Sequence, residues 1–425
     1  MLPQQKPKIA ILTIRNSYNY GGVLSNLKVA YEFCEQYFTP TVFFLGFDPD
    51  VATSVRRRKF TSSVKPLVYF GMNCVEVGAR WSFWEPGHYQ FTLSHWKALL
   101  KDYDYFFAIS GTCIAAHPLA LLKKKFAMWI GTPYFEDREE RIKQLTGVHK
   151  ILNALAHKRM MAIEQNIIDN AQTTFAIGSY VYKKMQSMRT NTSNNLVHCG
   201  FPIDCSKASL TPQPKENIIL AVGRFTDPRK NVAMLMHVFD GIYKQTPTMR
   251  LYVVGVKPTN EKMLAWMALP SFKNVSIVGQ VGSEDLTKLF KKASLLLITS
   301  HQEGLGIVGL EALLHGTPVV ATDCGGTRDY VIDGKTGFLV NVNDTQAMIQ
   351  KSVELLTNTT LHKQCSIEGQ TLIREQFSLP KIYTKLQDGL SFVYPELHDW
   401  FKACDKKAYE QKMSANQALL QQGAP

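Results

Sequence analysis

Two glutamates eight residues apart, Glu303 and Glu311, bracket a turn that is rich in glycine. An apolar run that is typical of a buried strand, 295–298, precedes the turn, and a helical pattern follows it as far as Gly316. A glycine turn at a helix N-terminus is a ready site for phosphate, because backbone N–H groups and the helix dipole both favour an anion. The two carboxylates must then bind something else, and hydroxyl groups are the natural candidates. The segment therefore favours a nucleotide-sugar.

The same turn also matches a dinucleotide-binding pattern. Gly304, Gly306 and Gly309 have the G-x-G-x-x-G spacing after a predicted strand. Asp323 lies at about the distance expected for a ribose contact. On its own this pattern would predict an NAD-dependent oxidoreductase. A third interpretation is that the glycines only allow a tight turn and a close contact between helix and strand.

Two cations in the segment 222–231 help to decide between these interpretations. Arg224 and Lys230 flank a proline-containing loop between a predicted strand and a predicted helix. Ligands bind at the carboxyl ends of parallel strands, so both cations can face the crevice that the Glu303 loop also faces. An oxidoreductase of this type needs no cations there, whereas transfer of a sugar from a nucleoside diphosphate does, because negative charge grows on the leaving phosphate. We therefore predict Glu303, Arg224 and Lys230 as catalytic residues.

Strands and helices alternate along both halves of the chain, which predicts an α/β fold with two parallel sheets. The 425 residues, 45% of them hydrophobic, are enough for two domains. We expect an N-terminal domain over 1–205, a second domain over 206–376, and C-terminal helices over 377–425 that return to the first domain. The predicted strands are 8–14, 41–46, 105–109, 126–130, 174–178, 218–223, 250–255, 275–279, 295–298 and 319–321. The main predicted helices are 23–35, 149–170, 232–243, 283–292 and 377–393.

Other features of the composition limit the class of protein. No apolar run approaches the roughly 20 residues that a membrane span needs. The first residues lack the pattern of a signal peptide, so we expect a cytoplasmic protein. The eight cysteines are scattered without a C-x-x-C pair, which argues against a disulfide framework or a zinc site.

The net charge of +13 is unevenly distributed. Residues 1–205 contain 24 Lys/Arg against 15 Asp/Glu, and residues 206–425 contain 24 against 20, so the excess lies mainly in the first half. Neither basic cluster, 56–59 or 123–125, has the interleaved aromatic residues of a nucleic-acid binder. A solvated basic face and a peripheral contact with an anionic membrane both remain open. The second cluster lies between apolar residues, which would suit a membrane contact.

Residues 217–345 resemble the donor-binding domain of family 4 retaining glycosyltransferases. That family has the GT-B fold, in which two Rossmann-like parallel-sheet domains face each other across a cleft. The resemblance is carried by the two cations and Asn231, the strand 275–279, the Glu303-x7-Glu311 spacing, the segment H-G-T-P-V-V-A-T-D from His315, and G-G-T-R-D-Y-V-I-D-G-K-T-G-F-L-V from Gly325. The first half resembles the family only in its strand order and in the Gly21-Gly22 turn.

The resemblance implies a role for each matching residue. Glu303 would contact the donor sugar, Glu311 would hold the ribose hydroxyls, and Arg224 and Lys230 would bind the phosphates. The other implied donor-binding residues are Gly304, Leu305, Gly306 and Ile307 in the turn, Gly279, Gln280 and Val281 near the base, and Gly22 across the cleft. The donor would be a UDP- or GDP-sugar, the acceptor a glycan, lipid or small molecule, and neither a cofactor nor a metal is expected.

One departure from the family concerns a histidine that usually follows the strand matching 126–130. Here Gly131, Thr132 and Pro133 occupy that position. His117 could replace the missing side chain, or it could be structural. Tyr134, Glu136 and Asp137 come next and could line the acceptor side. A non-catalytic protein of the same fold that binds a nucleotide-sugar therefore remains an alternative.

Overall fold

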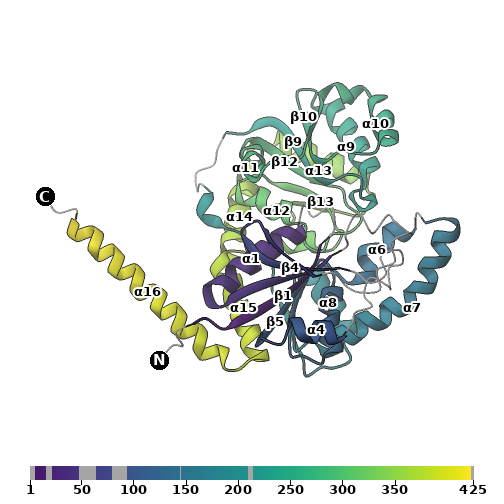
Figure 1. The fold of residues 1–425 in the computed structure, drawn as a ribbon. Coiled ribbons are helices and arrows are strands. Elements are labelled where there is room, and N and C mark those ends of the chain that lie inside the picture. The colour runs from purple at the N-terminus through teal and green to yellow at the C-terminus, as the bar shows by residue number, and fades with distance from the viewer. Residues whose placement is uncertain are drawn as a thin grey trace.

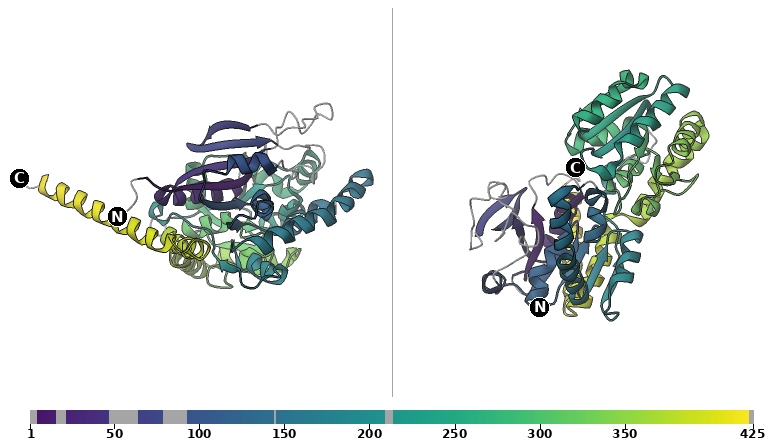
Figure 2. Two further views of the ribbon diagram at one scale, coloured as in Figure 1. Left: turned by 60° about the horizontal axis from the view of Figure 1, so that its bottom comes forward. Right: turned by 90° about the vertical axis from the view of Figure 1, so that its right-hand side faces the viewer.

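The computed structural model describes residues 5–15, 22–46, 64–78, 93–143, 145–208 and 214–422, which form two α/β units (Figure 1). Each unit is built on one central sheet. The first sheet has the strand order β3-β4-β2-β1-β5-β6-β7-β8, and the second has β11-β10-β9-β12-β13-β14. The right view of Figure 2 shows the two units as distinct lobes.

In the first sheet every pairing is parallel except that between β3 and β4. Successive residues of β1 point into different hydrophobic cores, with Ile9 and Ile11 on one face and Ala10 and Leu12 on the other. The strands are β1 Lys8–Arg15, β2 Thr39–Gly46, β3 Val64–Tyr69, β4 Met72–Gly78, β5 Tyr105–Ser110, β6 Ala127–Ile130, β7 Thr173–Ala176 and β8 Asn195–His198. The helices are α1 Gly22–Tyr37, α4 Leu93–Leu99, α5 His117–Leu121, α6 Tyr134–Ile142, α7 Gly147–Asn170 and α8 Ser179–Met188.

The second sheet is parallel throughout. Its strands are β9 Glu216–Arg224, β10 Arg250–Val256, β11 Val275–Gly279, β12 Ala293–Ile298, β13 Val319–Thr322 and β14 Gly337–Val340. Its helices are α9 Val232–Gln245, α10 Asn260–Met267, α11 Ser283–Lys292, α12 Ile307–Leu314, α13 Thr345–Thr357 and α14 Thr359–Gln376. All carboxyl ends of a parallel sheet lie at one edge, so the loops after β9, β12 and β13 can meet there.

The last two helices, α15 Leu379–Val393 and α16 Leu397–Gln422, belong with the first sheet. Ile382, Leu386 and Leu390 of α15 are fully buried in the same core as Phe107 of β5. Gly389 packs so closely on the sheet that a Cβ there would lie 2.3 Å from the Phe175 ring. The far end of α16 extends away from the body of the molecule (Figure 1).

Two features of the first sheet differ from the sequence-based expectation. The hairpin of β3 and β4 was not predicted, and it makes the sheet mixed rather than purely parallel. β3 is an edge strand with exposed Val64 and Val68 and an internal Pro66, so it lacks the buried apolar run that marks a parallel strand. β8, at the opposite edge, has only four residues and was also missed.

Only one of the two basic clusters lies in the described part of the chain. Residues 56–59 lie outside the described residues. Residues 123–125 precede β6 at its amino end, and their apolar neighbours Leu119, Phe126 and Trp129 are fully buried. The expected apolar surface beside this cluster is therefore largely core, although Leu121 is 38% exposed.

In the described part of the chain we find no helix with both the length and the apolar content needed to cross a membrane. Six of the eight cysteines are buried, as expected of small apolar side chains.

Candidate active site

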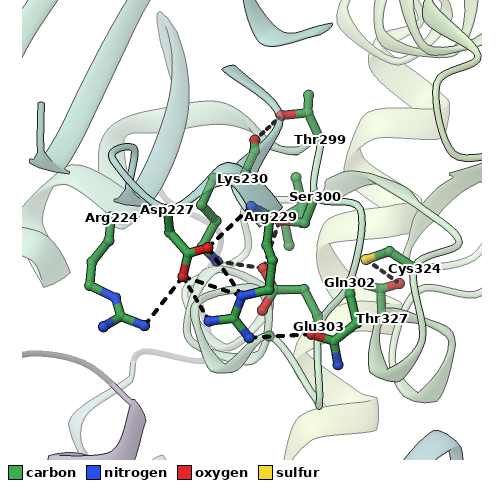
Figure 3. A network of polar contacts seen from close by, with 12 residues as sticks. Arg224, Asp227, Arg229, Lys230, Thr299, Ser300, Gln302, Glu303, Cys324 and Thr327 are labelled. Atoms are coloured by element: carbon green, nitrogen blue, oxygen red, sulfur yellow. Dashed lines mark hydrogen bonds and ion pairs between the residues drawn. The ribbon is translucent and has the colours of Figure 1, made fainter. Parts of the chain in front are cut away.

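The predicted catalytic side chains lie at the end of β9 and in the loops after β9 and β12, which are neighbouring strands. β9 ends at Arg224, and a short 3-10 helix, Pro228–Lys230, follows. Asn231 then adopts a left-handed conformation with φ 45° and caps α9 by accepting a hydrogen bond from Met234 N at 3.3 Å. This tight entry into α9 brings the 3-10 helix against the loop of Glu303 (Figure 3).

Lys230 and Glu303 form an ion pair at the centre of the site. Lys230 Nζ lies 2.5 Å from Glu303 Oε1, and the side chains are only 20% and 14% exposed. Ser300 Oγ donates to the same carboxylate oxygen at 2.7 Å. Burial opposes ionisation of Glu303, but the charge of Lys230 and the two hydrogen bonds outweigh it and hold the pKa of Glu303 below its ordinary value. Glu303 is therefore a carboxylate that fixes the position of the Lys230 ammonium.

Arg229 is a further cation of this network, and it is not among the residues predicted from the sequence. Its guanidinium, 14% exposed, donates to Asp227 at 2.7 Å and to Asp137 at 2.8 Å, and it also reaches Gln302 at 3.3 Å. Burial works against the charge on Asp227, but the hydrogen bonds and charge of Arg229 outweigh it and lower the pKa of Asp227 to about 2. Because Asp137 lies in α6, this cluster joins the two domains.

Arg224 lies at the outer side of the same network (Figure 3). Its side chain is 48% exposed, and its Nη2 atom lies 3.6 Å from Asp227 Oδ2. The structure thus brings all three predicted catalytic residues, Arg224, Lys230 and Glu303, into one group. It adds Asp227, which connects Arg224 to the buried guanidinium of Arg229.

Each glycine of the turn has a structural reason to lack a side chain. A Cβ on Gly304 would lie 2.0 Å from the carbonyl oxygen of Gly131 in the first domain. Gly306 has φ 80° and forms the N-cap position of α12. A Cβ on Gly309 would lie 2.3 Å from the ring of Tyr330, whose hydroxyl donates to Gly306 O at 2.9 Å. The turn therefore packs on the first domain at one end and on Tyr330 at the other.

Two helix N-termini meet across the domain interface at this turn. A Cβ on Gly22, the first residue of α1, would lie 3.4 Å from Cδ1 of Ile307, the first residue of α12. Leu305 is 2% exposed and belongs to the core. Because helix N-termini carry partial positive charge, this juxtaposition suits a diphosphate. Gly21, the other glycine of the expected turn, lies outside the described residues.

Glu311, on α12, has an environment unlike that of Glu303. Among the described residues its carboxylate has no hydrogen-bond or ion-pair partner, and burial raises its pKa to about 7. Gly279, Gln280 and Val281 lie at the end of β11, two strands from β9. In the register of the sheet, Val254 of β10 lies beside Val222 of β9 on one side and beside Gly279 of β11 on the other. The predicted base-binding segment therefore begins at the same edge of the sheet as the loop that carries Lys230.

The first domain presents the segment 131–133 where the family has its histidine. Thr132 Oγ1 accepts a hydrogen bond from Gln302 Nε2 at 3.2 Å, so this segment contacts the loop of Glu303. His117 is only 7% exposed, and burial, with a smaller effect from Arg159, lowers its pKa to about 4. Of its two predicted roles, the structure supports the structural one.

The side chains that follow β6, which were predicted to line the acceptor side, have different environments. Tyr134 is buried, whereas Glu136 pairs with Lys184 at 2.7 Å and accepts a hydrogen bond from the Tyr180 hydroxyl. Glu136 and Gln302 line a cavity of about 230 Å³ between the domains. Of the residues predicted for the acceptor side, Glu136 and Asp137 thus lie at the domain interface, whereas Tyr134 belongs to the core.

Asp329 makes a second polar bridge between the domains. It accepts hydrogen bonds from the backbone N of Ser179 at 2.7 Å and from the Ser179 hydroxyl. His198 Nε2 lies 3.4 Å from the same carboxylate. No sequence pattern indicates this bridge, because its partners are 150 residues apart and share no motif.

Comparisons with known proteins show a family match over most of the second domain. A family model described as glycosyl transferases group 1 matches residues 203–371. An uncharacterized glycosyltransferase from Methanocaldococcus jannaschii is 28% identical over 183 residues, which are 43% of this chain and 49% of the relative. The phosphatidyl-myo-inositol mannosyltransferase of Mycobacterium leprae is 29% identical over 157 residues, or 37% of this chain and 41% of that protein. The matches thus span at most about half the length of these curated relatives.

Solved structures resemble the chain over nearly its whole length. Sucrose-phosphate synthase from Thermosynechococcus elongatus has a TM-score of 0.68 at 16% identity, covering 93% of this chain and 100% of that one. Anabaena HepE in complex with UDP-glucose has a TM-score of 0.67 at 15% identity, covering 90% and 99%. These similarities concern the fold, and they confirm the predicted GT-B arrangement of two α/β domains.

Proposed function

Because this chain belongs to the glycosyl transferases group 1 family through residues 203–371, we propose that it is a retaining glycosyltransferase. It moves a sugar from a nucleoside-diphosphate sugar to an acceptor hydroxyl, in the synthesis of a glycan, glycolipid or polysaccharide. The proposed domains are 1–205 on the acceptor side, 206–376 for the donor, and 377–425 as helices returning to the first domain. The matched segment includes both cations, the glycine turn and both glutamates.

The observation that carries the proposal is the Lys230–Glu303 pair beside two facing helix N-termini. Lys230 has three N–H donors and uses one of them on Glu303, so it can also donate to a phosphate oxygen. The N-termini of α1 and α12 add partial positive charge from both domains. A diphosphate between them would be surrounded by preorganised donors, which is the arrangement that stabilises a leaving phosphate.

In the proposed reaction the bond between the anomeric carbon and the β-phosphate oxygen breaks. The acceptor oxygen forms a bond on the same face of the sugar, and its proton passes to the leaving phosphate. Arg224 and Lys230 stabilise the charge on the diphosphate, and Glu303 contacts the sugar. Glu311 accepts hydrogen bonds from the ribose hydroxyls.

The remaining donor residues are proposed from the family resemblance. Gly22, Gly304, Leu305, Gly306 and Ile307 form the phosphate side of the site, and Gly279, Gln280 and Val281 lie on the side of the base. The complexes of HepE with UDP and with UDP-glucose support UDP as the nucleotide part of the donor of this protein. We further propose that the protein is cytoplasmic and contacts the inner face of an anionic membrane, a placement that its net charge of +13 supports.

Titration calorimetry with UDP, GDP and NAD tests the donor class. We expect binding of a nucleoside diphosphate and none of NAD. Binding of NAD without binding of UDP or GDP would contradict the proposal in favour of an oxidoreductase.

Release of nucleotide from a panel of UDP- and GDP-sugars then separates an enzyme from a binding protein. The segment 131–133, which lacks the family histidine, favours the non-catalytic alternative. We expect turnover with at least one donor in the presence of its acceptor. Binding of a nucleotide-sugar with no turnover across the panel would favour the alternative.

A further inference from the structure

The cavity between the two domains, called the interdomain cavity below, has the size of a small ligand. Its volume is about 230 Å³. Pockets for drug-sized ligands begin at roughly 300 Å³, so this cavity suits a single sugar ring or a small polyol. One wall comes from α6 and α8 of the first domain, and the other comes from the segments that follow β12 and β13.

The interdomain cavity borders the backbone of Glu303 without being part of the predicted donor site. Gln302, which precedes Glu303, lines the cavity, and so does Cys324, whose carbonyl oxygen accepts a hydrogen bond from Glu303 N at 2.9 Å. Among the described residues that line the cavity, none was predicted to bind the donor. A molecule in the cavity would therefore lie beside the sugar that Glu303 is proposed to contact, which is where an acceptor must lie.

Carboxylates dominate the charged groups of the lining. Glu136, Glu139 and Glu140 of α6 form an acidic wall on the side of the first domain. Asp323 and Arg328 lie on the opposite wall, where Arg328 Nη2 donates to the two carboxylate oxygens of Asp323 at 2.7 and 2.8 Å. The opposite wall is therefore close to neutral, and the excess of negative charge lies on α6.

Two lysines pair with the acidic wall from outside the cavity. Lys184 Nζ lies 2.7 Å from Glu136 Oε1. Lys143 Nζ lies 2.7 Å from Glu140 Oε1 and 3.2 Å from Glu139 Oε1. The lysine side chains are 43% and 58% exposed, whereas those of Glu136 and Glu140 are 18% and 24% exposed, so water screens the lysines more strongly. Even with both lysines counted, the four carboxylates in and around the cavity face three cations.

Several polar groups of the lining are free to bind a ligand. Lys143 contacts Glu139 and Glu140 through Oε1 of each, and neither Oε2 atom accepts a hydrogen bond from a described residue. The His301 imidazole also lines the cavity and has no side-chain partner among the described residues. Ionised carboxylates only accept hydrogen bonds, so they suit hydroxyl and ammonium groups. An anionic group would be repelled, and the guanidinium of Arg328 that could bind it is already occupied.

We propose that the interdomain cavity binds the terminal unit of the acceptor and selects a neutral or amine-bearing sugar or polyol over a sugar phosphate or a uronate. The inference rests on the proposed function and names the class of its acceptor. Glu139 and Glu140 accept hydrogen bonds from hydroxyl or ammonium groups of this unit. Its reacting hydroxyl lies at the Glu303 end of the cavity, and that hydroxyl bonds to the anomeric carbon as its proton passes to the leaving phosphate.

The test is a ligand-observed NMR titration of the full chain, with and without UDP, at low ionic strength. The probes are three methyl glucopyranosides that differ only at C6, which carries an ammonium, a hydroxyl or a carboxylate group. We expect the amino sugar and the neutral sugar to bind the wild type. The uronate should bind at least about tenfold more weakly than the amino sugar, because the acidic wall repels its carboxylate.

Two charge substitutions should reduce this selectivity. Glu140→Gln removes one negative charge from the acidic wall, so the ratio of the uronate Kd to the amino-sugar Kd should fall at least about threefold. Asp323→Asn removes the ionic partner of Arg328, which can then bind the uronate, so this ratio should fall as well. The matched control is Glu354→Gln on α13, which breaks an i,i+3 pair with Lys351 at 2.9 Å outside the lining and should keep the wild-type ratio.

Three results would overturn the proposal. The first is a uronate that binds the wild type as tightly as the amino sugar does. The second is a wild-type ratio in both Glu140→Gln and Asp323→Asn. The third is no binding of any of the three sugars, with or without UDP. Failure of the proposed function would show instead as no binding of UDP or GDP, and the titrations without nucleotide would still report on the cavity.

Discussion

Replacing Lys230 by alanine should remove most of the turnover while leaving the fold intact. Its Nζ atom lies 2.5 Å from Glu303 Oε1, and both side chains are largely buried, with 20% and 14% exposed. The substitution leaves the Glu303 carboxylate with the hydrogen bond from Ser300 and the more distant charge of Arg229. The pKa of Glu303 should therefore rise toward or above its ordinary value.

Two losses combine in this variant. The charge-assisted hydrogen bond from Lys230 to the leaving phosphate contributes about 1.5–3 kcal/mol. Breaking one side of a buried ion pair costs a further ~3–5 kcal/mol, part of which appears as lower stability rather than as slower reaction. Since each 1.4 kcal/mol is about tenfold in rate, we expect kcat to fall at least a hundredfold. KM for the donor should change less, because the charge on the phosphate grows in the transition state.

The assay is release of UDP or GDP from the preferred donor, with the Tm of each variant measured in parallel. Lys244→Ala is the matched control, since Lys244 pairs with Asp240 at 2.8 Å on α9 but is 69% exposed. It should leave kcat within about twofold of the wild type. The double variant Lys230→Met/Glu303→Gln should recover stability, because no buried charge is left without a partner, but it should not recover turnover.

The reasoning would be refuted if Lys230→Ala kept kcat within tenfold of the wild type. It would also be refuted if the double variant recovered turnover together with stability, because the pair would then be a structural feature alone.

Three further predictions concern other parts of the site. Burial raises the pKa of Glu311 from 4.5 to about 7, so the free energy of unfolding should fall as pH rises from about 4.5 through 7, and Glu311→Gln should flatten that slope in urea titrations. Gly304→Ala would place a Cβ 2.0 Å from a backbone oxygen of the first domain, so it should lower kcat/KM at least about tenfold. The control Gly282→Ala should leave kcat/KM unchanged, because a Cβ there would have no other atom within 4 Å. Asp137→Asn removes the ionic bond from Arg229 between the domains and should lower kcat/KM about tenfold, with an unchanged rate arguing that the contact does not position the site.

In the second domain the sequence predicted five of the six strands of the sheet and missed the edge strand β14. The predicted strand 275–279 and helix 283–292 coincide with β11 and α11, and the predicted helix 232–243 is α9 shortened by two residues. In the first domain the central strands were clear, but the hairpin of β3 and β4 and the edge strand β8 were not predicted. Edge strands need not be apolar on both faces, so the pattern that marks a parallel strand is weak in them.

In the candidate site, the residues of the second domain could be predicted from the sequence, whereas their partners in the first domain could not. Arg224, Lys230 and Glu303 could be assigned together, because they follow the carboxyl ends of neighbouring strands of one sheet. Arg229 contacts Asp137, and Gln302 contacts Thr132, and both of these partners belong to the first domain. No local sequence pattern predicts which residues of two domains will come into contact. Arg229 could have been noticed from Asp227 two residues earlier, but its role in joining the domains required the structure.

The glycine turn illustrates why spacing alone left two chemistries open. In a dinucleotide-binding site the second glycine allows the backbone to approach a pyrophosphate, and the third allows a helix to pack on a strand. Here Gly304 is required by the first domain, and Gly309 is required by Tyr330.

Asp323, the residue that the dinucleotide interpretation needs for a ribose, pairs with Arg328 at 2.7 Å instead. The glycine spacing therefore indicates that other atoms approach the backbone closely at these positions. It does not indicate whether those atoms belong to a ligand or to the protein itself. The charged groups beside the turn carry that information, and a Lys–Glu pair backed by a second buried Arg–Asp pair fits a sugar diphosphate better than a dinucleotide.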